Sequence, residues 1–252
     1  MKKQTKQLWE HLGASNPYYA VGTFDKYRRR NLDAELKSEF FESGREHVEH
    51  IWNRFEKSFG IPLTPRRSLD YGCGVGRILV SLAEKSLDAV GVDISSTMLQ
   101  EARQNCENFG LSNVTLQDAN EFLLDGHEEF DFVHSFIVLQ HIKPELGYTL
   151  IRKMTSVLED GGAGMLHVTF HDPASLLMKF RTKLYLTFPG AHRMLCKLRG
   201  KDAELIPIHE YDLGWVFRIL RENGCGEIFV EFTHHGLLGA MIYFRKTMGR
   251  SQ

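Results

Sequence analysis

The sequence predicts an α/β fold in which a mostly parallel sheet carries helices on both faces. Between residues 66 and 170, short apolar runs alternate with segments of helical periodicity. A glycine-rich turn follows the first apolar run, and an acidic residue ends the second. The chain has 252 residues, enough for one domain with additions.

The segment before the sheet is predicted to be helical. Apolar side chains recur at helical spacing between Glu39 and Phe59, which indicates an amphipathic helix. Two prolines shortly after it break the chain. We therefore expect an N-terminal helical cover, residues 1–64, and a second domain, residues 65–252, with an insertion at 171–208.

Strands and helices alternate through the second domain. Strands are predicted at 67–71, 89–93, 113–117, 130–138, 163–170, 227–233 and 238–246. Helices are predicted at 76–85, 95–109, 144–158 and 211–223, with a short turn near 119–124. The helix that begins at Pro144 is expected to stop at Gly161-Gly162. In such a fold, ligands bind beyond the carboxyl ends of the strands.

The most informative stretch is Ser68–Arg77, which reads SLDYGCGVGR. Its three glycines leave bare backbone where a strand passes into a helix, and such a turn suits the anionic end of a ligand. A dinucleotide fingerprint has a glycine at the sixth position of the turn, where this chain has Arg77. Asp93 ends the second predicted strand, where an acid can hold two ribose hydroxyls.

This pattern resembles the first motif of the class I S-adenosylmethionine-dependent methyltransferases, Asp-x-Gly-Cys-Gly-x-Gly. The Phe130–His141 stretch is similar to the fourth strand and following loop of that family. The resemblance covers roughly residues 40–170 and, by architecture alone, 209–246. It implies a Rossmann-like, seven-stranded, mostly parallel sheet with an antiparallel C-terminal hairpin, a helical N-terminal cover and an inserted lid. It also implies S-adenosyl-L-methionine as the cofactor.

The resemblance assigns roles to residues of the cofactor site. Arg77 would pair with the methionine carboxylate, or else be a solvated charge at a helix end. Asp93 would bind the ribose, and Asp118 the adenine amino group. The full expected set is Asp70, Gly72, Cys73, Gly74, Gly76, Arg77, Asp93, Ile94, Met98, Asp118, Ala119, Ser135, Phe136 and Gln140.

Two histidines are candidates for the catalytic base. His141 lies on the loop that would face the acceptor, where it either takes a proton from a hydroxyl or ammonium group or orients the loop. His171, just past the fifth strand, is the second candidate. His134 and His167 fall in mid-strand and are expected to be core residues. Methyl transfer needs no metal, and we expect none.

Aromatic residues near the N-terminus leave two interpretations open. The stretches around Tyr18, Tyr19 and Phe41 resemble a leader of bacterial methyltransferases that folds over the cofactor. Alternatively, these side chains pack a helix on the sheet.

The composition narrows the class of partner. A net charge of −1 argues against binding to DNA. The loop after the fourth strand also lacks the cysteine nucleophile that methylation of a pyrimidine base at C5 needs, which argues against that reaction. The four cysteines show no paired spacing, and no stretch has a signal-peptide pattern, so we expect a cytoplasmic protein.

The insertion carries lysines and arginines but no acidic residue between Pro173 and Lys201. It is interpreted either as a lid for an anionic or sugar-like acceptor or as a membrane-surface contact through 174–201. A third interpretation is a solvated cover with no preference for the charge of the acceptor. The working function is methyl transfer to O or N of a small molecule. The alternatives are a non-catalytic cofactor-binding regulator or scaffold and an enzyme for lipid-linked or RNA acceptors. The oligomeric state is not predicted.

Overall fold

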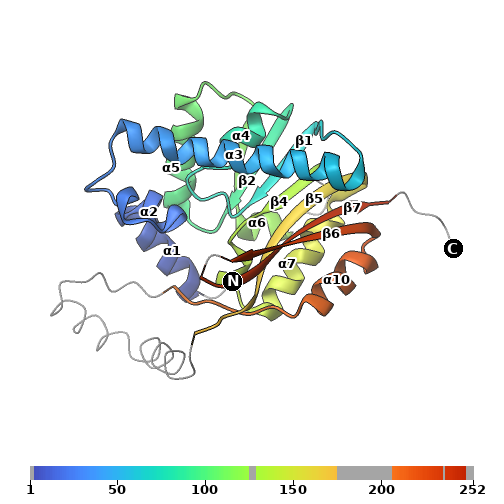
Figure 1. Ribbon diagram of the computed structural model, residues 1–252. Coiled ribbons are helices and arrows are strands. Elements are labelled where there is room, and N and C mark those ends of the chain that lie inside the picture. The colour runs from blue at the N-terminus through green and yellow to red at the C-terminus, as the bar shows by residue number, and fades with distance from the viewer. Residues whose placement is uncertain (1–2, 125–128, 175–205, 235, 248–252) are drawn as a thin grey trace.

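The fold is a seven-stranded sheet with helices on both faces. The computed structural model describes residues 3–124, 129–174, 206–234 and 236–247 (Figure 1). The strand order is β3-β2-β1-β4-β5-β7-β6. The strands are β1 (Arg67–Tyr71), β2 (Asp88–Asp93), β3 (Val114–Asp118), β4 (Phe130–Ser135), β5 (Leu158–His171), β6 (Cys225–His234) and β7 (Leu238–Lys246). The first five are parallel, and β7 runs antiparallel to its neighbours β5 and β6. The predicted fold class is confirmed.

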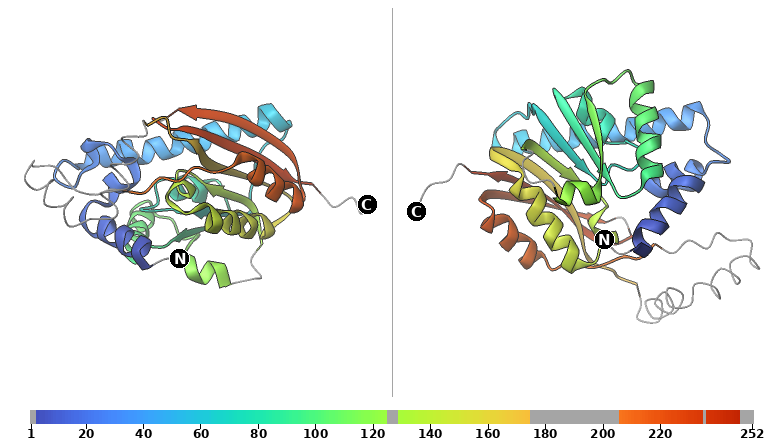
Figure 2. Two further views of the ribbon diagram at one scale, coloured as in Figure 1. Left: turned by 90° about the horizontal axis from the view of Figure 1, so that it is seen from below. Right: turned by 180° about the vertical axis from the view of Figure 1, so that it is seen from behind.

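Helices cover both faces of the sheet (Figure 2). The helices are α1 (Lys3–Ser15), α2 (Pro17–Gly22), α3 (Ala34–Phe59), α4 (Leu79–Glu84), α5 (Ser96–Asn108), α6 (Ala119–Leu124), α7 (Pro144–Ser156) and α10 (Leu213–Glu222). Short 3₁₀ turns are η1 (Asp25–Tyr27) and η2 (Leu139–His141). Helices α3, α4 and α5 pack on one face, and α6, α7 and α10 pack on the other.

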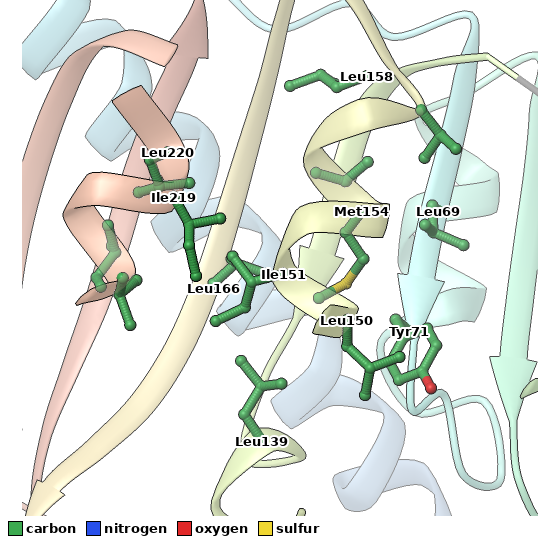
Figure 3. Close-up of a cluster of buried hydrophobic side chains, with 14 of the residues drawn as sticks. Leu69, Tyr71, Leu139, Leu150, Ile151, Met154, Leu158, Leu166, Ile219 and Leu220 are labelled. Atoms are coloured by element: carbon green, nitrogen blue, oxygen red, sulfur yellow. The ribbon is translucent and has the colours of Figure 1, made fainter. Parts of the chain in front are cut away.

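The face under α7 and α10 has a continuous apolar core (Figure 3). Leu150, Ile151 and Met154 of α7 are fully buried. They meet Leu69 of β1 and Leu166 of β5 in one cluster. Removing this apolar surface from water is the main force that holds these helices on the sheet.

Helix α3 crosses the opposite face and begins earlier than predicted. The side chain of Asp33 accepts a hydrogen bond from the Leu36 N–H at 2.8 Å, which caps the helix. Gly60, in the left-handed conformation, ends it. The rings of Trp52 and Phe132 lie 5.0 Å apart between α3 and β4.

The end of α7 differs from the prediction. The helix stops at Ser156, and β5 starts at Leu158, so Gly161 and Gly162 lie within a strand. The pairing of β4 with β5 shifts register between Phe130 and Phe132, and this irregularity accommodates the glycines. A glycine pair therefore marks a bulged strand here rather than a helix end.

Most of the basic insertion falls in a range that the structure does not describe. Residues 175–205, which include nearly all of the segment interpreted as a lid or membrane contact, lie outside the described residues. Across the described ranges, no helix combines the length and apolarity needed to cross a bilayer.

Gly44 is the place where α3 approaches the glycine turn most closely. A Cβ at this position would lie 2.1 Å from the carbonyl oxygen of Arg77. We expect Gly44→Ala to lower the free energy of unfolding by about 1–3 kcal/mol because the helix is pushed off the turn. In an unobstructed helix the same change would stabilise by about 1 kcal/mol.

Urea denaturation would measure this effect. Glu49→Ala, at an exposed position of the same helix, is the control and should stay within about 0.5 kcal/mol of the parent protein. A Gly44→Ala protein more stable than the parent would contradict the close approach.

Candidate functional site

A cavity of about 510 Å³ lies beyond the carboxyl ends of the central strands. Its floor comes from the ends of β1 and β2 and from the loops after β3 and β4. The chain passes from one side of β1 to the other between β3 and β4, so this is the switch point of the sheet. Helices α1 and α2 form one wall, and residues 206, 208, 233, 236 and 237 form another.

The glycine turn brings bare backbone to the cavity. Gly72, Gly74 and Gly76 have φ values of 82°, 54° and 88°, a region in which other residues are strained. A Cβ on Gly72 would lie 2.2 Å from Val138, so glycine is also needed for space. The thiol of Cys73 is buried, and burial raises its pKa well above the ordinary value. The buried side chain of Cys73 therefore fills the turn.

Asp93 is held against the turn by backbone hydrogen bonds. One carboxylate oxygen accepts from the Gly74 N–H at 3.0 Å, and the other accepts from the Ser95 N–H at 2.9 Å. Burial raises the pKa of Asp93 to about 6, although these hydrogen bonds oppose the rise. Each oxygen keeps a second lone pair, so the carboxylate can accept from two neighbouring hydroxyl groups.

Arg77 lines the same end of the cavity and is not a solvated charge. One terminal nitrogen reaches the Ser43 hydroxyl at 3.3 Å, while the buried Nε has no hydrogen-bond partner among the described atoms. Burial lowers the pKa of the guanidinium, and the negative charge of Asp70 partly offsets this. A buried cation with an unused donor favours an anionic ligand group at this position.

Helix α1 closes the side of the cavity near β2 and β3. The Glu10 carboxylate accepts hydrogen bonds from the backbone N–H groups of Ser96 and Thr97, at 2.8 and 3.1 Å, and so caps α5 from outside. Burial alone would raise the pKa of Glu10, but the hydrogen bonds outweigh it and lower the pKa to about 2. This contact places Trp9 in the cavity wall.

His141 is fixed in one tautomer by its neighbours. Its Nδ1 lies 3.0 Å from the carbonyl oxygen of Pro207, which can only accept, so Nδ1 carries the proton. Its Nε2 therefore holds a lone pair, which the Gln140 amide reaches at 3.2 Å. The Thr169 hydroxyl donates to the Gln140 carbonyl oxygen at 2.9 Å and orients that amide. Burial lowers the pKa of His141, although the bond to Pro207 opposes this, so the ring is neutral at pH 7.

Most of the predicted site residues lie together in this cavity, and four do not. Those that line it are Asp70, Gly72, Cys73, Gly74, Arg77, Asp93, Ile94, Met98, Ala119, Phe136, Gln140 and His141. Those that do not are Gly76, Asp118, Ser135 and His171.

Each of the four residues outside the cavity has another environment. Gly76 completes the turn beside Ala102. The Ser135 hydroxyl is buried and donates to the Tyr71 carbonyl at 2.9 Å, and His171 is exposed at the end of β5. Asp118 binds Lys6 of α1 at 2.9 Å. Burial would raise the pKa of Asp118, but the hydrogen bonds from Asn120 and Lys6 lower it.

Tyr18, Tyr19 and Phe41 contribute packing rather than cavity lining. The Tyr18 hydroxyl donates to Glu101 at 2.6 Å, its ring packs edge-on against Phe40 and Phe41, and none of Tyr18, Tyr19 and Phe41 lines the cavity. Sequence reasoning missed the wall residues Thr5, Trp9, Val21, Thr169, Ile206 and Ile208. No motif marks them, because they reach the cavity through tertiary contacts. Nor do the described residues include any cluster of three His, Cys, Asp or Glu side chains able to hold a metal ion.

Comparison with known proteins shows similarity to methyltransferases over part of the chain. Residues 69–162 match a family model described as a methyltransferase domain. The ubiquinone biosynthesis O-methyltransferase of Methylococcus capsulatus is 32% identical over 101 residues, 40% of this chain and 42% of that protein. Residues 69–162 are therefore similar to methyltransferase domains, and the chain spans less than two thirds of the length of the curated relatives it matches.

Other similarities to the methyltransferase domain are distant or partial. The carboxy-S-adenosyl-L-methionine synthase of Sulfurimonas denitrificans is 30% identical over 56% of this chain and 63% of that protein. The magnesium protoporphyrin IX methyltransferase of Synechocystis PCC 6803, solved with bound SAH, superposes with a TM-score of 0.57 at 20% identity. That superposition covers 92% of this chain and 98% of the other, and it shows the shared fold.

The tautomer of His141 can be measured directly in this protein. We expect ¹⁵N NMR to show a protonated Nδ1 and an unprotonated Nε2 at pH 7, with a pKa below the ordinary 6.5. The Gln140→Leu variant is the control, because it should shift the Nε2 resonance and leave Nδ1 bonded to Pro207. A proton on Nε2 would contradict the arrangement.

Proposed function

We propose that this protein transfers the methyl group of S-adenosylmethionine to a hydroxyl oxygen of a small, largely apolar molecule. The observation that carries the proposal is one cavity lined by the glycine turn, Asp93 and Arg77 together with His141. When bound, S-adenosylmethionine supplies a methyl group already activated on sulfur.

The donor end of the cavity fits the parts of that cofactor. The guanidinium of Arg77 offers a partner for the carboxylate, and the carboxylate of Asp93 offers two acceptors for the ribose hydroxyls. Ile94, Met98 and Ala119 give an apolar surface beyond Asp93, toward β3, which suits the adenine ring. Asp70 lines the cavity beside the turn, where a carboxylate stabilises the cationic end of the amino acid.

The acceptor end lies on the side of β5 and β6. Trp9, Ile206, Ile208 and Leu237 form apolar walls there, and Thr169 and Thr233 add hydroxyl groups. Among the described lining residues, Arg77 is the one lysine or arginine, and it belongs to the donor end. These walls favour an uncharged alcohol or phenol.

The state of His141 supports oxygen rather than nitrogen as the acceptor atom. A hydroxyl must lose its proton as it attacks, whereas a neutral amine attacks through a free lone pair. The neutral ring holds its Nε2 lone pair toward Gln140, and an acceptor hydroxyl would take the place of that amide. The bond from Nδ1 to Pro207 then stabilises the imidazolium that forms. The relatives named O-methyltransferases point the same way.

Calorimetric binding of S-adenosylhomocysteine tests the donor end. We expect its affinity to fall as the pH drops below about 6, by up to tenfold per unit, because protonation of Asp93 removes an acceptor for the ribose. Asp93→Asn should bind weakly and lack this pH dependence. Asp88→Asn, at the other end of β2, is the matched control and should bind like the parent protein. Undiminished binding by Asp93→Asn would overturn the assignment.

Release of S-adenosylhomocysteine with a panel of phenols, aliphatic alcohols, amines and sugar phosphates tests the reaction. With the best acceptor, we expect His141→Asn to lower kcat by about 10²–10⁴-fold, since the amide keeps a donor for Pro207 but has no base at the Nε2 position. The affinity for S-adenosylhomocysteine should not change.

His171→Asn is the control for this experiment and should keep full activity, because His171 lies outside the cavity. If the protein binds the cofactor but methylates nothing in the panel, a regulatory or scaffold role is favoured. If amines alone are methylated, the hydroxyl assignment is wrong.

A further inference from the structure

Three polar side chains form a hydrogen-bonded row beneath the cavity. The Asp70 carboxylate lies 2.8 Å from Nδ1 of His134, and Nε2 of His134 lies 3.1 Å from Nε2 of His47. Asp70 and His134 are register partners on the adjacent parallel strands β1 and β4, and His47 belongs to α3. Asp70 lines the cavity, whereas the two histidines do not.

The hydrogen bond at the Asp70 end of this row has a fixed direction. A carboxylate can only accept, so Nδ1 of His134 donates to Asp70. At the other end, the Nε2 atom of one histidine donates to the Nε2 atom of the other. Burial and the neighbouring His134 and Arg77 lower the pKa of His47 well below its ordinary value, so this ring is neutral.

His47 is itself anchored by packing. Its ring lies 4.2 Å from that of Phe136, centroid to centroid, and Phe136 lines the cavity. One turn earlier in α3, Gly44 lies against the carbonyl of Arg77. Helix α3 therefore contacts both charged groups at the donor end, Arg77 directly and Asp70 through two histidines.

Apolar side chains would fill the same space without the cost of burying the polar groups of Asp70 and His134. His134 is fully buried, and its two nitrogens are used on two specific partners. A row of this kind restricts the rotation of the carboxylate at its end.

We propose that His134 and His47 are positioning residues for Asp70. They hold one carboxylate oxygen from below and leave the other available to the ammonium group at the amino-acid end of the cofactor. This inference rests on the proposed function, because it takes S-adenosylmethionine as the ligand of the cavity.

Two ligands separate positioning from general support. S-adenosylhomocysteine has the amino-acid end, and 5′-methylthioadenosine has the same adenosine and thioether without it. We expect His134→Leu to weaken binding of the first about tenfold or more, the value of a hydrogen bond to a charged group, and to leave the second unchanged. His134→Asn keeps an N–H at the Nδ1 position and should restore most of the affinity.

His47→Leu should give a smaller selective loss, about threefold, because His134 then loses one of its two anchors. His50→Leu is the matched control. It removes a histidine from the same helix whose partner is Glu231, at 3.0 Å, and both affinities should stay at the parent values.

The outcomes distinguish the inference from the function beneath it. A parent protein that binds neither ligand overturns the proposed function. If the parent protein binds both ligands, but His134→Leu loses affinity for both equally or for neither, the positioning role alone is overturned. If His134→Leu does not fold in a thermal melt, His47→Leu decides, and an unchanged ratio of the two affinities rejects the inference.

Discussion

The site depends on how closely the backbone between β1 and α4 can be approached from several sides. Val138 packs over Gly72, Val21 of α2 lies near Gly74, and Gly44 of α3 meets the carbonyl of Arg77. Each approach requires a missing side chain on one partner. Because the turn is enclosed in this way, the carboxylates and the guanidinium around it are largely removed from water. Their unused hydrogen-bonding capacity is then available to a ligand that fits between them.

Site residues that belong to short local motifs could be predicted from the sequence. Asp93 and Arg77 lie in the cavity because each is adjacent to a strand end or turn whose geometry is local. The strands and helices of the sheet could also be predicted, because the spacing of apolar residues along the chain distinguishes strands from helices. Local signals were ambiguous where one residue type serves two structures, and Gly161 and Gly162 read as a helix end although they lie in a bulged strand.

Features set by distant contacts could not be predicted. Lys6 and Asp118 are 112 positions apart, and their ion pair turns the expected adenine ligand toward α1. His134 looked like a core histidine, and it is buried, but its role depends on which side chain of α3 lies above it. Trp9 and Thr169 line the cavity, but no sequence motif marks them. Apolar and hydroxyl residues occur throughout a protein, and only the folded chain shows which of them face a cavity.

The contact of Glu10 with the first turn of α5 bears on how such a protein can change during evolution. Helix α1 supplies the cap for the helix that follows Asp93, and it also supplies Trp9 to the wall near His141. The first helix is thus shared between the two ends of the cavity. An exchange of the N-terminal segment with that of another protein would alter the cap of α5 and the wall near His141 together. In this chain the two ends of the cavity are not separate modules, and a change in one constrains a change in the other.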